Sequence, residues 1–241
     1  SNITTPGITQ IINLKNSKNY ILNKSNNPLE NYSVGKTELN EIKSNDDTKL
    51  YSRLIKPSYF DESEKYPVLV YVYGGPHAQL VTNSWLAGAS LWMYWMAEQG
   101  YIIFTIDGRG SANRGFEFES SIFRNLGDVE MKDQISGLNY LKGLNYIDTN
   151  RLAVHGWSYG GFMTTSLMTR YPNLFNVGVA GGPVIDWKWY EVMYGERYMD
   201  QPKSNEEGYK NNSLLNYAKF LKGDLLLIHG TGDDVVVMQH N

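Results

Sequence analysis

The sequence contains no cysteine, and this absence excludes several kinds of chemistry together. Without thiols there are no disulfides, no cysteine nucleophile and no thiolate metal ligands. Long apolar runs are absent too, since none approaches the roughly 20 residues that a helix needs to span a bilayer. The first ten residues, SNITTPGITQ, lack the basic start and apolar core of a secretory signal, which leaves a cytosolic protein or an excised piece of a longer one as interpretations.

The chain also lacks an excess of positive charge. The chain has 22 Lys and Arg against 25 Asp and Glu, a net charge of -3, and no basic run, which argues against nucleic acid as a partner. No His-Glu-x-x-His or similar ligand spacing occurs, and DGRGSANRG lacks the glycine spacing of a dinucleotide site. We therefore expect neither a metal nor a cofactor.

What the chain does contain is the composition of a globular protein. Its 241 residues, 41% hydrophobic and 20% charged, suit one large α/β domain or two small ones. Up to about residue 50, short apolar runs alternate with Asn-rich turns and predict short strands or hairpins. KLYSRLIKP then predicts an edge strand that Pro57 ends.

From Tyr66 onward, strand and helix patterns alternate. YPVLVYVYGG, YIIFTIDG, RLAVHGW, VGVAGG and DLLLIHG predict short buried strands, and the helices are expected over 84–100, 128–144 and 159–172. Asp128 suits an N-cap and Gly100 a C-terminal cap. This alternation predicts a doubly wound, mostly parallel sheet whose active groups collect at the carboxyl ends of its strands.

One of these strand ends carries VHGWSYGGF, with Ser158 between Gly156 and Gly160. The pattern Gly-x-Ser-x-Gly between a strand and a helix is typical of a nucleophile elbow, where glycines are needed because the two backbones crowd the turn. We expect Ser158 to be a nucleophile whose backbone lies outside the helical and extended regions.

A serine nucleophile needs a base and an acid that orients it. LLLIHGTGDDVV places Asp233 and Asp234 after a predicted strand, and either could be the acid or a turn residue. His77, His155 and His229 precede this pair, and His240 follows Asp233 by only seven residues. We therefore expect the base to lie beyond residue 241.

Oxyanion donors and a substrate pocket can be sought at the same strand ends. The backbone N–H of Tyr159 follows the nucleophile and is the first donor. Tyr73, in the loop VYGGPHAQ, is either a second donor or a core aromatic. Val184, Trp187, Tyr190 and Tyr194 form either an apolar pocket or a hydrophobic helix face.

Together, VYGGPH, DGRGS, RLAVHGWSYGGF, ERYM and HGTGDD resemble the C-terminal catalytic domain of the prolyl oligopeptidase family, dipeptidyl peptidase IV branch. The resemblance implies an α/β-hydrolase fold over 41–241, truncated at its C-terminus, and a leader over 1–40 that is a remnant of a β-propeller. It implies Ser158 as nucleophile, Asp233 as acid, and Tyr73 beside the Tyr159 amide as oxyanion donors. The pocket for proline or alanine would be lined by Val184, Trp187, Tyr190, Tyr194 and Val236.

This sequence departs from the family at two points. Val235 replaces an Asn that contacts the substrate in relatives, and of the propeller whose glutamates hold the substrate amine in relatives we expect only the last strands, in residues 1–40. We expect a serine peptidase that, at full length, releases Xaa-Pro or Xaa-Ala dipeptides from peptides, while these 241 residues alone are inactive. The alternatives are an acylaminoacyl peptidase or oligopeptidase, or a silent interaction module that dimerises. By resemblance the protein is periplasmic or secreted, with the cytoplasm as the alternative.

Overall fold

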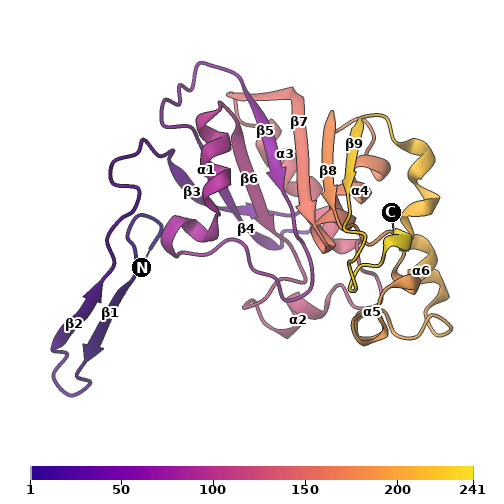
Figure 1. The fold of residues 1–241 in the computed structure, drawn as a ribbon, viewed down its shortest axis with the longest axis horizontal. Helices are drawn as coiled ribbons and strands as arrows, with labels where there is room; N and C mark the ends of the chain where they lie inside the picture. Colours follow the sequence, from indigo (N-terminus) through magenta and orange to yellow (C-terminus); the bar gives the residue numbers. More distant parts are fainter. Residues whose placement is uncertain (1, 241) are drawn as a thin grey trace.

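A seven-stranded sheet forms the centre of the molecule in the computed structural model, which describes residues 2–240 (Figure 1). Its strands are β3 (Thr37–Lys43), β4 (Lys49–Ile55), β5 (Tyr66–Tyr71), β6 (Ile102–Asp107), β7 (Ile147–Trp157), β8 (Val177–Gly181) and β9 (Asp224–Ile228). They are ordered β3-β4-β6-β5-β7-β8-β9, and only the β3–β4 and β4–β6 pairings are antiparallel. The predicted mostly parallel α/β sheet is confirmed.

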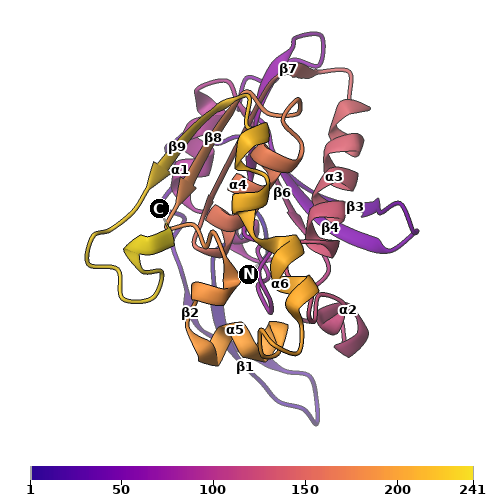
Figure 2. The ribbon, with the colours of Figure 1, turned by 90° about the vertical axis from the view of Figure 1, so that its right-hand side faces the viewer.

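Helices cover both faces of this sheet. Helix α1 (Leu91–Glu98) lies on one face, and α3 (Val129–Lys142) and α4 (Tyr159–Arg170) lie on the other (Figures 1 and 2). Helix α4 packs on β7 and β8 and is buried over almost its whole length. Three short helices lie beyond the carboxyl ends of the parallel strands: α2 (Phe116–Ser120), α5 (Val192–Met199) and α6 (Glu206–Asn212).

The helix predicted over 84–100 is shorter than expected. A 3₁₀ turn over Trp85–Gly88 precedes α1, and inside it Leu86 and Ala87 have φ values of 59° and 54°. The buried Arg53 guanidinium donates to the carbonyl oxygens of Leu80 and Ala87, each at 2.8 Å. These tertiary hydrogen bonds hold the loop in its non-helical path, so the helix begins only at Leu91. Gly100 ends it with a φ of 91°, as predicted for a C-terminal cap.

The edge-strand prediction for KLYSRLIKP is wrong. Strand β4 lies between β3 and β6, pairing with both. Arg53, in this strand, is 1% exposed; its Nη1 donates to two carbonyl oxygens and its Nη2 to Thr105 Oγ1 at 3.1 Å, while its Nε has no partner among the described residues. These hydrogen bonds offset part of the cost of burying the Arg53 charge.

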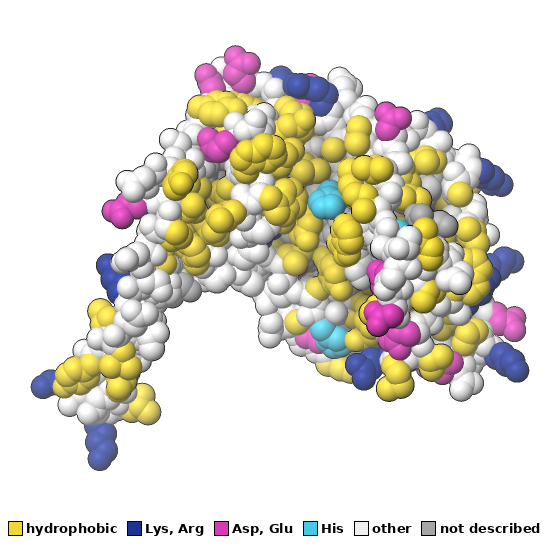
Figure 3. Space-filling model, viewed as in Figure 1, with side chains coloured by type: hydrophobic (Ala, Val, Ile, Leu, Met, Phe, Trp, Pro, Cys, Tyr) yellow, Lys and Arg dark blue, Asp and Glu magenta, His cyan; other side chains and the backbone are white. Residues whose placement is uncertain are grey.

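The prediction that strand β9 is buried is also wrong. Leu226 and Ile228 are 56% and 40% exposed, because among the described residues β9 pairs only with β8. Figure 3 shows hydrophobic side chains spread across the viewed face of the molecule, including the side where β9 lies. Among the described residues, β9 therefore leaves apolar side chains exposed at this edge of the sheet.

The N-terminal residues form a separate hairpin. Strands β1 (Ile8–Ile12) and β2 (Asn19–Lys24) pair antiparallel and project away from the sheet (Figure 1), which confirms the hairpin expected there. Strand β3 begins at Thr37, close to the boundary expected at residue 40, and the domain division stays a prediction. Within residues 2–240, no helix has both the length and the apolar character needed to traverse a lipid bilayer.

Candidate active site

Ser158 occupies a strained turn between β7 and α4. Its φ of 57° and ψ of -116° lie outside the helical and extended regions, as predicted for a nucleophile elbow. Such a conformation costs roughly 1–3 kcal/mol and persists only where the surrounding structure imposes it. Here Ser158 N donates to Gly181 O at 2.8 Å, and Phe162 N donates to Ser158 O at 3.0 Å. The side chain is half-buried and stands at the carboxyl end of β7.

The flanking glycines are required by backbone contacts. A Cβ on Gly156 would lie 2.3 Å from Val72 O and 2.4 Å from Gly160 O. A Cβ on Gly161 would lie 2.5 Å from Gly181 O, at the end of β8. None of these neighbours is a flexible side chain that can move aside, so any larger residue would force α4 away from the sheet. The glycines therefore set the position of Ser158.

A small cavity of about 20 Å³ opens beside Ser158. Its lining brings together seven residues, all of them named by sequence reasoning: Tyr73, Ser158, Tyr159, Val184, Trp187, Tyr190 and Tyr194. Val236 is buried but does not line this cavity. Most of the predicted site therefore converges on one point, from the loop after β5, the start of α4 and the segment between β8 and α5.

Trp187 is the centre of the aromatic wall. Its ring stacks on Tyr194, with centroids 6.1 Å apart and planes 14° apart, and meets Tyr190 edge-on at 5.6 Å. It also lies 5.2 Å from the ring of Tyr159 and 5.0 Å from that of Phe162. Asp186 caps the turn that carries Trp187, accepting from Lys188 N at 3.1 Å. These ring contacts hold the aromatic wall against α4, the helix that begins directly after Ser158.

Tyr73 and Tyr159, the two residues predicted to supply oxyanion donors, both line the cavity beside Ser158. Burial raises the pKa of the Tyr73 hydroxyl, so this group stays a neutral donor at physiological pH. Tyr159 is the first residue of α4, and its N–H therefore has no partner within the helix. Gly75 allows the two rings to meet, since its Cβ would lie 2.6 Å from Tyr73 Cε1 and 3.0 Å from Tyr159 Cγ.

Asp233 lies in the loop after β9, and its carboxylate is fixed by the backbone. Oδ1 accepts from Val236 N at 2.9 Å and from Val235 N at 3.0 Å, and these bonds lower its pKa. Oδ2 points toward the end of β8, 3.7 Å from where a Cβ on Gly182 would be. No hydrogen bond to Oδ2 is present within residues 2–240. Asp234 is exposed.

The four histidines are all engaged elsewhere. His77 Nδ1 lies 2.9 Å from Glu119 Oε2, His155 Nδ1 2.8 Å from Val179 O, and His229 Nε2 2.6 Å from Val236 O. His240, the alternative base, accepts from Ile185 N at 3.0 Å through Nδ1, and burial lowers its pKa. Within residues 2–240, no histidine is hydrogen-bonded to Ser158 or Asp233.

One buried group beside the site was missed by sequence reasoning. Glu130, in the first turn of α3, is 1% exposed and accepts from Tyr159 Oη at 2.6 Å. Asp128 precedes α3 at the predicted N-cap position, but its side chain makes no capping hydrogen bond. The signal for Glu130 in the sequence is weak, because acidic residues are common in the first turn of exposed helices.

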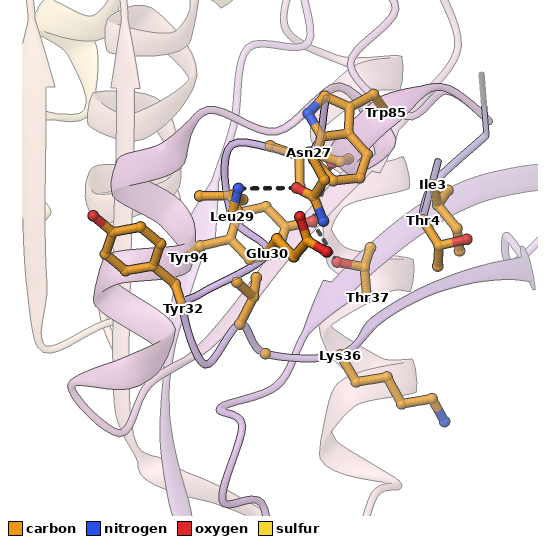
Figure 4. Close-up of a pocket in the computed structure, with 13 residues that line it drawn as sticks. Ile3, Thr4, Asn27, Leu29, Glu30, Tyr32, Lys36, Thr37, Trp85 and Tyr94 are labelled. Atoms are coloured by element: carbon orange, nitrogen blue, oxygen red, sulfur yellow. Dashed lines mark hydrogen bonds between the residues drawn. The ribbon is translucent and has the colours of Figure 1, made fainter. Parts of the chain in front are cut away.

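A larger cavity of about 570 Å³ lies between the N-terminal residues and α1 (Figure 4). Its lining includes Asn27 and Leu29 from the segment after β2, and Trp85 and Tyr94 from the 3₁₀ turn and α1 (Figure 4). Thr37 Oγ1 and Tyr94 Oη are hydrogen-bonded at 2.5 Å across its floor. No predicted catalytic or pocket residue lines this cavity, so its size does not make it the reaction site.

Comparison with solved structures supports the same fold. A Bacteroides ovatus protein assigned as a dipeptidyl aminopeptidase IV superposes with a TM-score of 0.95 at 54% identity, covering 98% of this chain and 34% of that one. Porphyromonas gingivalis dipeptidyl peptidase 4 gives a TM-score of 0.91 at 35% identity, over 100% of this chain and 34% of that one. The fold is therefore that of an α/β-hydrolase.

Curated sequences point the same way. Mouse dipeptidyl peptidase 8 is 36% identical over 217 residues, 88% of this chain and 24% of that protein. Bovine prolyl endopeptidase FAP is 37% identical over 222 residues, 89% of this chain and 28% of that protein. The chain thus spans about a quarter of the length of these relatives. Residues 88–241 match the profile of the Prolyl oligopeptidase family. The chain therefore belongs to the prolyl oligopeptidase family of peptidases.

Proposed function

We propose that the full-length protein is a serine peptidase that releases Xaa-Pro or Xaa-Ala dipeptides from peptide N-termini through an acyl-enzyme on Ser158. One observation carries the proposal: Ser158, on its strained turn, opens onto the same small cavity as Tyr73 and the Trp187 wall. A nucleophile, a donor and an apolar pocket thus surround the position that a scissile carbonyl would take. The names of the relatives, which include dipeptidyl peptidases, support the same class of substrate.

In the proposed reaction, Ser158 Oγ attacks the carbonyl carbon while a histidine base takes its proton. The negative charge that develops on the carbonyl oxygen would be stabilised by the Tyr159 N–H and the Tyr73 hydroxyl. The amine leaves with a proton from the base, and water then hydrolyses the ester on Ser158. Asp233 would orient the base through Oδ2, since Oδ1 already accepts two backbone N–H groups.

The shape of the pocket supports specificity for small or cyclic residues. Trp187, Tyr190 and Tyr194 line it with flat rings, and Val184 also lines it. A pyrrolidine ring or a methyl group can pack on such rings, whereas a long side chain has no space to occupy. Val236 was predicted to line this pocket; its N–H donates to Asp233 Oδ1, and it does not line the cavity beside Ser158.

We also propose that these 241 residues have no peptidase activity on their own. Each of the four histidines has a partner other than Ser158 or Asp233. Without a base, the serine hydroxyl is a weak nucleophile, and only a residual rate from the oxyanion site and from binding remains. The base would then come from a histidine outside this sequence.

The test uses the full-length protein with Gly-Pro and Ala-Ala anilides and a fluorophosphonate probe. We expect turnover and labelling, both lost in Ser158→Ala and both kept in Ser166→Ala. Ser166 is a matched control because it is a buried serine on the same helix whose hydroxyl has no partner. Cleavage of only N-blocked or internal peptide bonds would favour an acylaminoacyl peptidase or oligopeptidase. Absence of labelling and turnover would favour a silent module.

A further inference from the structure

Glu130 is a buried carboxyl group that the proposed reaction does not use. It lies in the first turn of α3, is 1% exposed, and has no cationic partner among the described residues. Gly127 N donates to its two oxygens at 3.1 and 3.0 Å, and Tyr159 Oη donates to Oε1 at 2.6 Å. A buried carboxyl without a countercharge is costly, so the structure retains it against a desolvation penalty.

The charge state of Glu130 follows from these contacts. Burial raises its pKa to about 7, and the Tyr159 hydroxyl and Gly127 N–H oppose this rise without cancelling it. Two further groups act on it, Asp133 on its own helix and Tyr194 on α5, and neither is a cation. The bond from Tyr159 is therefore strong because it ends on a poorly solvated acceptor.

The Tyr159 side chain that Glu130 holds lies between both parts of the site. Its ring is 6.0 Å from that of Tyr73, the proposed oxyanion donor, and 5.2 Å from that of Trp187, the pocket wall. The same residue carries the backbone N–H that follows Ser158. A shift of Tyr159 would therefore disturb the donor N–H, the Tyr73 ring and the pocket together.

The segment around Glu130 also contacts α5, the helix that carries Tyr194. Gly127 packs on α4, where an added Cβ would lie 2.4 Å from Phe162 Cζ. Leu126 N donates to Met199 Sδ at 3.3 Å, and Arg124 N donates to Tyr198 O at 2.7 Å. The loop before α3 thus joins α4 to α5, and Glu130 is the side chain at their junction.

We propose that Glu130 is a positioning residue for the oxyanion site, which holds the Tyr159 ring and thereby the Tyr159 N–H and the Tyr73 ring in the geometry that acyl transfer needs. The inference rests on the proposed function, because it requires an oxyanion to be stabilised at Ser158. A purely structural role at the start of α3 would affect folding but not the chemical step in folded protein.

The test measures kcat and KM of the full-length enzyme on a Gly-Pro anilide. The variants are Glu130→Gln, Tyr159→Phe and the double variant, with circular dichroism and urea unfolding to establish the folded fraction. Asp133→Asn is the matched control, because Asp133 is a buried carboxylate on the same helix that binds Arg109 instead of the elbow. Ser158→Ala establishes that the measured turnover depends on the elbow.

We expect each single variant to lower kcat about 10-fold, within the range for misplaced catalytic groups, with KM changed less than twofold. The double variant should lose no more than the larger single loss, since Glu130→Gln weakens the same hydrogen bond that Tyr159→Phe removes. Asp133→Asn should keep kcat within twofold. If Glu130→Gln fails to fold, the test rests on Tyr159→Phe, which removes the hydroxyl that donates to Glu130 but keeps the packed aromatic ring.

Wild-type kcat in folded Glu130→Gln or Tyr159→Phe, or additive losses in the double variant, would overturn this inference alone. An inactive wild-type enzyme, or activity that survives in Ser158→Ala, would instead overturn the proposed function and this inference with it.

Discussion

Replacing Glu130 by Gln should change how the stability of the domain depends on pH. The pKa of Glu130 is raised by burial from an ordinary value of 4.5 to about 7 in the folded protein. Between these values the folded state binds more protons than the unfolded state. The stability that this group contributes is therefore fully present below pH 4.5 and is lost as pH rises through about 7.

The magnitude follows from the same two values. A difference of about 2.5 between the folded and unfolded pKa corresponds to roughly 3 kcal/mol, at 1.36 kcal/mol for each unit. The glutamine side chain of the variant cannot ionise. The free energy of unfolding of the variant, minus that of the wild type, should therefore rise by roughly 3 kcal/mol between pH 4.5 and pH 8.

Urea unfolding followed by tryptophan fluorescence, at intervals of half a pH unit, measures this difference. Tyr159→Phe serves as an internal check, because it removes a hydrogen bond that lowers the pKa of Glu130. In that background the loss of stability should extend to higher pH. A difference between variant and wild type that does not change with pH would refute the reasoning, since it would show that Glu130 ionises alike in the folded and unfolded chain.

The remaining predictions concern the elbow and the pocket. Tyr73→Phe in the full-length enzyme should lower kcat by about 10²–10³ with little change in KM, and unchanged turnover of an anilide substrate would assign Tyr73 to the core. Tyr190→Ala should lower the kcat/KM for proline substrates and raise it for bulky ones, as measured across a series of dipeptide anilides. If neither value changes, the aromatic side chains of the pocket pack against one another without selecting the substrate. Gly161→Ala should cost about 1–3 kcal/mol of unfolding free energy, because its Cβ would lie 2.5 Å from Gly181 O. Gly232→Ala, which meets nothing within 4 Å, should lie within about 0.5 kcal/mol of wild type in the same urea titration, and equal costs would contradict the contact argument.

The sequence predicted the elbow correctly because the reason for its glycines is local. Gly156, Ser158 and Gly160 lie within five residues of one another, and the crowding that excludes a Cβ arises between the strand and helix that meet there. The strands β5 to β8 were equally predictable, since apolar runs bounded by glycines are what a covered parallel strand needs. Local pattern and fold agree at these positions.

The predictions that failed depended on which segments become neighbours. KLYSRLIKP predicted an edge strand, but β3 pairs with the outer side of β4, and distant carbonyl and hydroxyl groups accept from the two terminal nitrogens of the buried Arg53. DLLLIHG has the composition of a buried strand, yet β9 has a partner on one side only among the described residues. Whether a strand is buried depends on which segments pack beside it, and the composition of the strand does not specify those segments.

By itself, the sequence determined the α/β class, the position of the nucleophile turn and the set of aromatic side chains that line the cavity beside Ser158. Only the tertiary structure decided how Glu130 is used. In sequence it is an acidic residue in the first turn of a helix, an ordinary place for an exposed carboxylate. Its partner Tyr159 is 29 residues away, and the two meet only because α3 and α4 pack on the same face of the sheet. That packing removes water from the carboxyl group, which raises its pKa and makes the hydroxyl of Tyr159 its main remaining side-chain donor.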